Sequence, residues 1–140
     1  MSFSFSIPPE LEKQLEKISN IDVIAPKMLE AAAPIIVKAI KARTPAKTGD
    51  LKNSVKASEP TLSKRGSWMC NIYFDGYEKR QLKSGKIVKI PNAVKAATLE
   101  FGRNTKEIAP TAFVSNAIKD SAEEVAAAMQ NVFETEAKST

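Results

Sequence analysis

The chain has 140 residues, of which 43% are hydrophobic and 26% charged, and its formal net charge is +5. This composition is ordinary for a globular protein, and the length predicts a single domain over residues 1–140. The absence of histidine and the single cysteine exclude an internal disulfide, an all-cysteine zinc site and the histidine-dependent catalytic triads.

Charge is distributed unevenly along the chain. Residues 1–37 contain 3 basic residues (Lys or Arg) and 5 acidic residues (Asp or Glu). Residues 38–95 contain 14 basic and 4 acidic residues, and residues 96–140 contain 4 basic and 7 acidic residues. A basic middle between acidic ends suits electrostatic docking, either to nucleic acid or between copies of the chain, although a solvated basic loop gives the same pattern. No apolar run approaches the roughly 20 residues that span a bilayer, and the N-terminus does not resemble a secretory signal, so we expect no membrane partner and synthesis in the cytoplasm.

The first 25 residues are expected to form a small N-terminal segment. Residues 1–7 should be a loose or strand-like tip, and Pro8 and Pro9 offer a rigid start to a short helix. The apolar stripe of this helix consists of Leu11, Leu15 and Ile18.

The core of the domain, residues 26–136, begins with a second helix that we expect to run from Pro26 toward Lys41. Pro34 lies inside the helical pattern, removes one backbone hydrogen bond and costs about 3 kcal/mol. The apolar stripe continues in phase beyond Pro34, so the pattern predicts a kink at this residue and not a break.

A corner follows the second helix. Pro45 pushes Thr44 out of the helical region, so the helix should end near Arg43. Gly49 permits backbone angles that other residues resist, and Leu51 should lie in a short helical turn. Local side-chain hydrogen bonds are expected to hold this corner together.

Two strands are predicted after the corner, over residues 54–59 and 67–75. The second has the clearest alternation, and one face of it carries Trp68, Cys70, Ile72 and Phe74. This placement predicts that Cys70 is an inert, buried thiol in the core.

Residues 77–90 are predicted to form a basic arm or hairpin with a turn at Ser84–Gly85. The candidate residues for contact with a partner or with DNA are its cations, Lys79, Arg80, Lys83, Lys86 and Lys89. They can bind phosphates or an acidic neighbouring subunit, and a mobile, solvated loop is the alternative. Tyr77 is the only aromatic residue of the arm, so it offers no stacking platform for single-stranded nucleic acid.

Two more helices are predicted near the C-terminus. The first starts at Asn92 as its N-cap and runs to about Glu100, and Gly102 stops it. Its residues at helical spacing are Val94, Ala97 and Phe101. The last and longest helix covers residues 112–135, after a cap at Ala109–Pro110–Thr111. Its apolar positions are Phe113, Ala117, Ile118, Ala122, Val125, Met129, Val132 and Phe133.

Together these elements predict an α+β protein. We expect a small antiparallel sheet from residues 54–59, 67–75 and 86–90, with the kinked helix 26–42 and the helix 112–135 packed on one face. The glycines form neither a phosphate-binding loop nor a dinucleotide fingerprint. A carboxylate pair of Glu100 and Glu107 beside one loop is a very weak catalytic signal, so we expect no enzyme, no cofactor and no metal.

Three motifs occur in a fixed order along the chain. The corner contributes Thr44, Pro45, Thr48, Gly49, Leu51 and Ser54. The second motif is Glu100–Phe101–Gly102, and the third joins Pro110 to Phe113 with Thr111 and Ala112 between them. This set resembles the tail-component (gene-product-ten-like) family of lambdoid long-tailed bacteriophages.

The resemblance implies a structural virion protein, made in the bacterial host cytoplasm, without catalytic residues. It implies a tail-completion or head–tail neck component that forms or joins a homo-oligomeric ring, expected to be a hexamer. The implied neighbours are the tail tube, tail terminator or head-completion proteins, with non-specific contact to packaged DNA. From their chemistry, we expect Gly49 and Gly102 to provide backbone angles, Pro45 to stop the helix and Glu100 to bond loop amides. The alternative function is a small basic nucleic-acid-binding module that uses the 77–90 arm.

Overall fold

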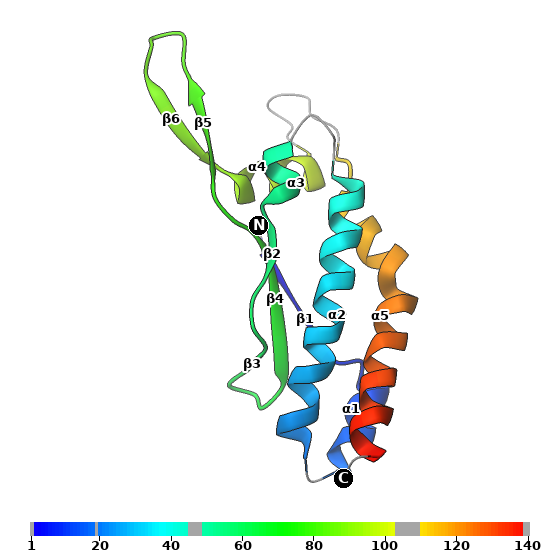
Figure 1. Ribbon diagram of the computed structural model, residues 1–140. Helices are drawn as coiled ribbons and strands as arrows, with labels where there is room; N and C mark the ends of the chain where they lie inside the picture. Colours follow the sequence, from blue (N-terminus) through cyan, green and yellow to red (C-terminus); the bar gives the residue numbers. More distant parts are fainter. Residues whose placement is uncertain (1, 19, 45–48, 103–109, 139–140) are drawn as a thin grey trace.

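Two long antiparallel helices dominate the computed structural model (Figure 1). They are α2 (Ile21–Arg43) and α5 (Phe113–Lys138), which lie side by side. The structure describes residues 2–18, 20–44, 49–102 and 110–138. The helices lie on one side of a small antiparallel sheet, which confirms the α+β fold class. Within these residues, no helix is long and apolar enough to cross a membrane.

The sheet is built around one central strand, β4 (Trp68–Phe74). One edge of β4 pairs with β1 (Ser2–Ser6), so the strand-like tip expected at the N-terminus is part of the sheet. The other edge pairs with β2 (Val55–Ala57) and with the short β3 (Thr61–Leu62). Residues on the inner face of β4 are buried, as predicted, including Cys70, Ile72 and Phe74.

The predicted third strand of this sheet was wrong. Residues 87–90 belong to β6 (Ile87–Pro91), which pairs with β5 (Tyr77–Gln81) in a separate two-stranded sheet. Gly85 has φ +86, a left-handed angle that suits the tight reversal between the two strands. The hairpin therefore projects from the body as an arm (Figure 1).

Helix α2 begins earlier than Pro26, so the predicted start was wrong. Its first turn is set by Asn20, whose carbonyl accepts hydrogen bonds from the backbone N–H groups of Val23 and Ile24 at 3.0 Å. Ile24 and Ala25 are buried, so the packed face of the helix already includes them. The helix is not broken at Pro34 and ends at Arg43, as predicted.

The shorter helices complete the body. Helix α1 (Pro9–Glu16) buries Leu11 and Leu15, as its pattern predicted. The predicted helical turn at the corner is α3 (Gly49–Asn53), in which Leu51 is fully buried. Helix α4 (Asn92–Phe101) follows the arm directly and ends at Gly102.

The packed faces of α4 and α5 differ in part from the predictions. In α4, Val94 is 50% and Phe101 70% exposed, because the buried side is formed by Ala96 and Glu100. In α5, Ile118 and Ala122 are exposed, whereas Val114 and Ser121 are buried. Small residues on the inner side of α5 allow it to lie close to α2.

Candidate functional site

The corner motif is held by side chains that bond the backbone. Thr44 has extended backbone angles, φ −70 and ψ 131, and its hydroxyl donates to the carbonyl of Ile40 at 2.7 Å. The hydroxyl of Ser54 donates to the carbonyl of Leu51 at 2.6 Å. These contacts give the described motif residues a structural role; Pro45 and Thr48 lie outside the described residues.

Glu100 joins the second motif to the third. Its carboxylate accepts hydrogen bonds from the backbone N–H groups of Val114 at 2.8 Å and Ser115 at 3.1 Å, and from the Ser115 hydroxyl. These are among the N–H groups at the start of α5 that lack a partner within the helix, and a carboxylate there opposes the helix dipole. Glu100 is therefore the cap of α5, and the amides that it bonds belong to this helix and not, as expected, to a loop.

The remaining residues of these two motifs fix the entry into α5. The Thr111 hydroxyl donates to the Leu99 carbonyl at 2.7 Å. The prediction that Thr111 caps α5 was therefore wrong. The ring of Phe113 meets that of Phe74 edge to face, with centroids 6.0 Å apart. Gly102 has φ 76 and ψ 178, which is a region open essentially to glycine alone. Pro110 is exposed.

Hydrogen bonds tie the root of the arm to the body. The side-chain amide of Asn92 donates to the carbonyl of Asp75 at 2.9 Å. The backbone N–H of Asn92 donates to the carbonyl of Gly76 at 3.0 Å. The predicted N-cap role of Asn92 was therefore wrong, since Pro91 occupies the cap position without a side-chain bond. Lys56 lies 2.8 Å from the Asp75 carboxylate; this contact raises the pKa of Lys56 and lowers that of Asp75.

One carboxylate balances only part of the charge on the arm. Glu78 forms ion pairs through its carboxylate oxygen Oε2, which lies 3.3 Å from Lys95 Nζ and 3.1 Å from Arg80 Nη2. Both cations, Lys95 foremost, lower the pKa of Glu78. Among the described residues, none of the four arm lysines forms an ion pair with a carboxylate. They are Lys79, Lys83, Lys86 and Lys89.

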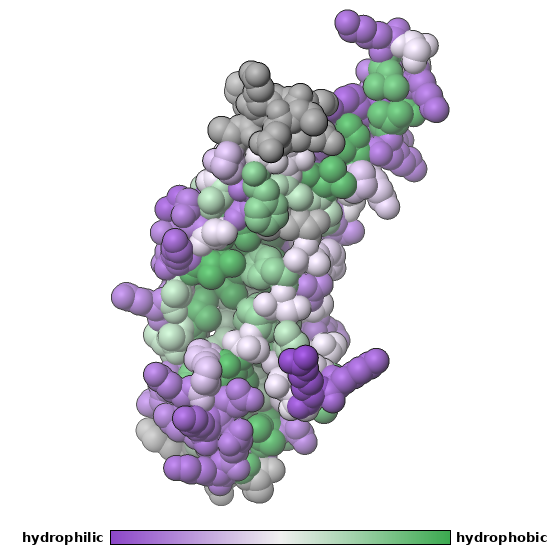
Figure 2. Space-filling model, turned by 180° about the vertical axis from the view of Figure 1, so that it is seen from behind, coloured by the Kyte–Doolittle hydropathy of each residue, from purple (hydrophilic) through white to green (hydrophobic). Residues whose placement is uncertain are grey.

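The strand register sorts the arm residues into two faces. Lys79 lies directly opposite Lys89, with Gln81 opposite Ile87 and Tyr77 opposite Pro91. Paired residues in an antiparallel ladder point to the same side, so one face, here called the lysine face, carries two facing lysines with exposed apolar neighbours. Tyr77 and Ile87 are each 65% exposed, and Figure 2 shows hydrophobic side chains, in green, among the hydrophilic ones of the arm.

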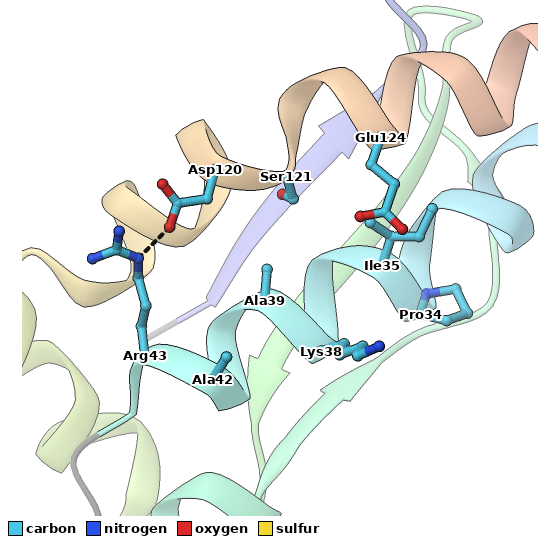
Figure 3. Close-up of a pocket in the computed structure, with 9 residues that line it drawn as sticks. All are labelled: Pro34, Ile35, Lys38, Ala39, Ala42, Arg43, Asp120, Ser121 and Glu124. Atoms are coloured by element: carbon cyan, nitrogen blue, oxygen red, sulfur yellow. Dashed lines mark hydrogen bonds and ion pairs between the residues drawn. The ribbon is translucent and has the colours of Figure 1, made fainter.

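A groove of about 490 Å³ runs between α2 and α5. Figure 3 shows its residues. The least exposed lining residues form the floor and are Ile35, Ala39 and Ser121. The exposed lining residues form the rim and are Pro34, Lys38, Ala42, Arg43, Asp120 and Glu124. An ion pair joins Arg43 to Asp120 across the groove.

Of the candidate carboxylate pair, Glu100 is described by the structure and Glu107 lies outside the described residues. In the part of the chain that the structure describes, no three His, Cys, Asp or Glu side chains are grouped so that they could hold a metal ion. Glu100 uses both carboxylate oxygens to cap α5. Burial raises the pKa of the Cys70 thiol, which makes the reactive thiolate less available.

Comparison with known proteins identifies a family that matches most of the chain. The family described as "Bacteriophage HK97-gp10, putative tail-component" matches residues 9–102. This range includes the corner, the central strand, the arm and the Glu100–Gly102 motif. No curated protein and no solved structure matches. Since the family match covers more than half of the chain, the protein belongs to the HK97-gp10-like family of bacteriophage tail components.

Proposed function

We propose that the protein is a tail-completion or neck component that forms or joins a ring where the tail of a phage or prophage particle meets the head. Its place is then in the virion, beside the tail tube, tail terminator or head-completion proteins. The observation that carries this proposal is the arm, a projecting hairpin whose lysine face has no counter-charge within the described residues.

The arm needs a partner for physical reasons. A two-stranded hairpin is marginally stable by itself in water, and directly opposed like charges, as at Lys79 and Lys89, destabilise the pairing. A neighbouring surface that supplies negative charge and covers Ile87 would remove both penalties. This makes the arm better suited to assembly than to a role within one isolated chain.

The charge distribution supports contact between copies of the chain. The arm projects from the sheet side, whereas α5 lies on the opposite side of the molecule (Figure 1). Exposed carboxylates are present on α5 at Asp120, Glu123 and Glu124. Contact between different surfaces of two identical copies is head-to-tail, and such contacts close into rings when the rotation allows. Six copies are expected from the symmetry of phage tails.

The second candidate function is a basic nucleic-acid-binding module, favoured by the five cations of the arm. In the ring, some of these lysines could also face the passing DNA, where they would act through non-specific phosphate contacts. The two functions differ in what the isolated protein does. A ring component associates with itself, whereas a binding module takes up DNA as a monomer.

Native mass spectrometry of the purified protein at micromolar concentration, with and without a short DNA duplex, tests the proposal. We expect a closed oligomer of defined copy number that forms equally well without DNA. A variant with serine at the five arm cations, Lys79, Arg80, Lys83, Lys86 and Lys89, should lose this oligomer. A monomer that binds the duplex and releases it steeply with salt would contradict the proposal.

A further inference from the structure

We propose that the lysine face of the arm docks into the groove between α2 and α5 of the next copy of the chain. This inference rests on the proposed assembly of identical copies and names the two surfaces that meet. It assigns the groove one occupant, the hairpin of residues 77–91 from a neighbouring subunit.

The α5 side of the groove is complementary in charge to the lysine face, whereas the α2 side carries the cations Lys38 and Arg43. Asp120, Glu123 and Glu124 lie at i, i+3 and i+4 on α5, so they share one helix face. Asp120 is paired with Arg43, but neither Glu123 nor Glu124 has an ion-pair partner in the described parts of the chain. Of these two, only Glu124 lines the groove, and Glu123 is exposed next to it on α5. The α5 side of the groove thus offers one free carboxylate in the groove and one beside it to the two facing lysines of the arm.

The apolar parts of the two surfaces are also complementary. Ile87 is exposed and points to the same side of the hairpin as Lys79 and Lys89. The floor of the groove includes the apolar residues Ile35 and Ala39, and a volume of about 490 Å³ is in the range that proteins use to enclose small molecules. Ile87 can therefore be buried on the floor while the lysines reach the rim.

The placement of the two surfaces favours contact between different copies. Figure 1 shows the arm extending away from the body on the side of the sheet, and α5 on the far side of α2. The arm of one molecule points away from its own groove, so its occupant must come from another molecule. Docking of this kind is head-to-tail and leaves each copy with one arm and one groove in use.

Cysteine cross-linking tests whether the surfaces meet. One chain carries Gln81→Cys, on the lysine face opposite Ile87, and a second carries Ala42→Cys, in the groove. After the two are mixed and treated with a short bismaleimide, we expect heterodimers several times above the background from wild-type chains, whose Cys70 is buried. The matched control replaces Ala42→Cys with Val23→Cys, exposed on the same helix outside the groove. Equal yields from the two pairs would overturn the proposal.

Charge exchange tests the chemistry of the contact. Lys79→Glu with Lys89→Glu, or Glu123→Lys with Glu124→Lys, should each weaken self-association about tenfold or more. Mixing the two variants should restore it, because opposite charges then face each other at every contact between the two kinds of chain. Lys83→Glu with Lys86→Glu makes the same change of charge near the hairpin turn and should have a smaller effect.

The outcomes separate the docking contact from the ring. A closed wild-type oligomer that survives both charge exchanges and gives no specific cross-link would overturn the docking contact and leave the ring in place. A specific cross-link between chains that form only open oligomers would support the docking contact and overturn the ring. The variant with Lys79→Glu and Lys89→Glu could also lose DNA binding without any change in self-association. That result would overturn the docking contact in favour of a DNA-facing arm.

Discussion

The body of the molecule and its arm are stabilised in different ways. In the body, Leu51 from α3, Met28 from α2 and Ile72 from β4 are fully buried. In the arm, none of residues 77–91 is buried, and the hairpin depends on its own strand pairing and on contacts at its root. The body is therefore stabilised by its packed core, whereas the arm leaves most of its side chains exposed.

The largest expected effect is on the body. Leu51→Ala should lower the free energy of unfolding by about 2–5 kcal/mol, because it leaves a cavity under the corner. Urea unfolding followed by circular dichroism measures this loss. Leu62→Ala is the matched control, since Leu62 is 54% exposed, and it should change stability by less than about 0.5 kcal/mol. Equal effects of the two substitutions would contradict the assignment of Leu51 to the core.

The cap of α5 should have the next largest effect. Glu100→Ala leaves the N–H groups of Val114 and Ser115 without their acceptor, so we expect a loss of about 1–3 kcal/mol in unfolding free energy. Glu100→Gln keeps one acceptor oxygen and should cost less. Urea unfolding of both variants provides the measurement, and wild-type stability in Glu100→Ala would show that the carboxylate is not a cap.

Acid should weaken the contacts at the root of the arm. The folded protein lowers the pKa of Glu78 and Asp75, so their ion pairs stabilise the fold above the unfolded-state pKa. This stabilisation is lost as the pH falls through the lower, folded-state pKa. The loss begins below about pH 4, near the ordinary pKa of a carboxyl group. The pKa of Lys56 is raised. The contribution of Lys56 to stability is therefore lost only as the pH rises above the ordinary pKa of lysine and through the raised, folded-state pKa.

An NMR titration of the Glu78 carboxyl carbon checks this prediction. Its midpoint should lie below that of an ordinary glutamate in the wild type and move upward in Lys95→Ala, since Lys95 is the main cause of the shift. An unchanged midpoint in Lys95→Ala would contradict the ion pair.

The smallest expected effect on stability comes from the arm cations. The free energy of unfolding of the variant with serine at all five positions should lie within about 0.5 kcal/mol of the wild-type value, because these side chains are exposed. Its self-association should nevertheless be lost. Chemical unfolding and native mass spectrometry of the same preparation separate the two effects. A strongly destabilised variant would mean that the arm contributes to the body and that the contrast between the two regions is wrong.

Local patterns in the sequence predicted those parts of the fold that depend on near neighbours. The alternation of Trp68 to Phe74 identified the central strand and its buried face, and Pro45 marked the end of α2 through its effect on Thr44. The arm was also predictable as a hairpin because Gly85 permits its turn. Each of these features depends on backbone angles or spacing within a few residues.

Features that depend on tertiary contacts were harder to predict. The pairing of β6 with β5 instead of β4 is a choice between partners that alternation cannot make. The start of α2 was placed at Pro26, since proline favours a first turn, although the chain packs Ile24 and Ala25 as helix already. The groove was not predicted, because it needs two helices that lie far apart in sequence.

Hydrogen exchange of the arm as a function of protein concentration tests the central claim most directly. We expect the amides of residues 77–91 to exchange rapidly at dilutions where the chain is monomeric and slowly in the assembled state. The amides of β4, residues 68–74, should be protected in both states. An arm that is protected as strongly as β4 in the monomer, or that still exchanges rapidly in a closed oligomer, would contradict the claim that the arm is stabilised by assembly.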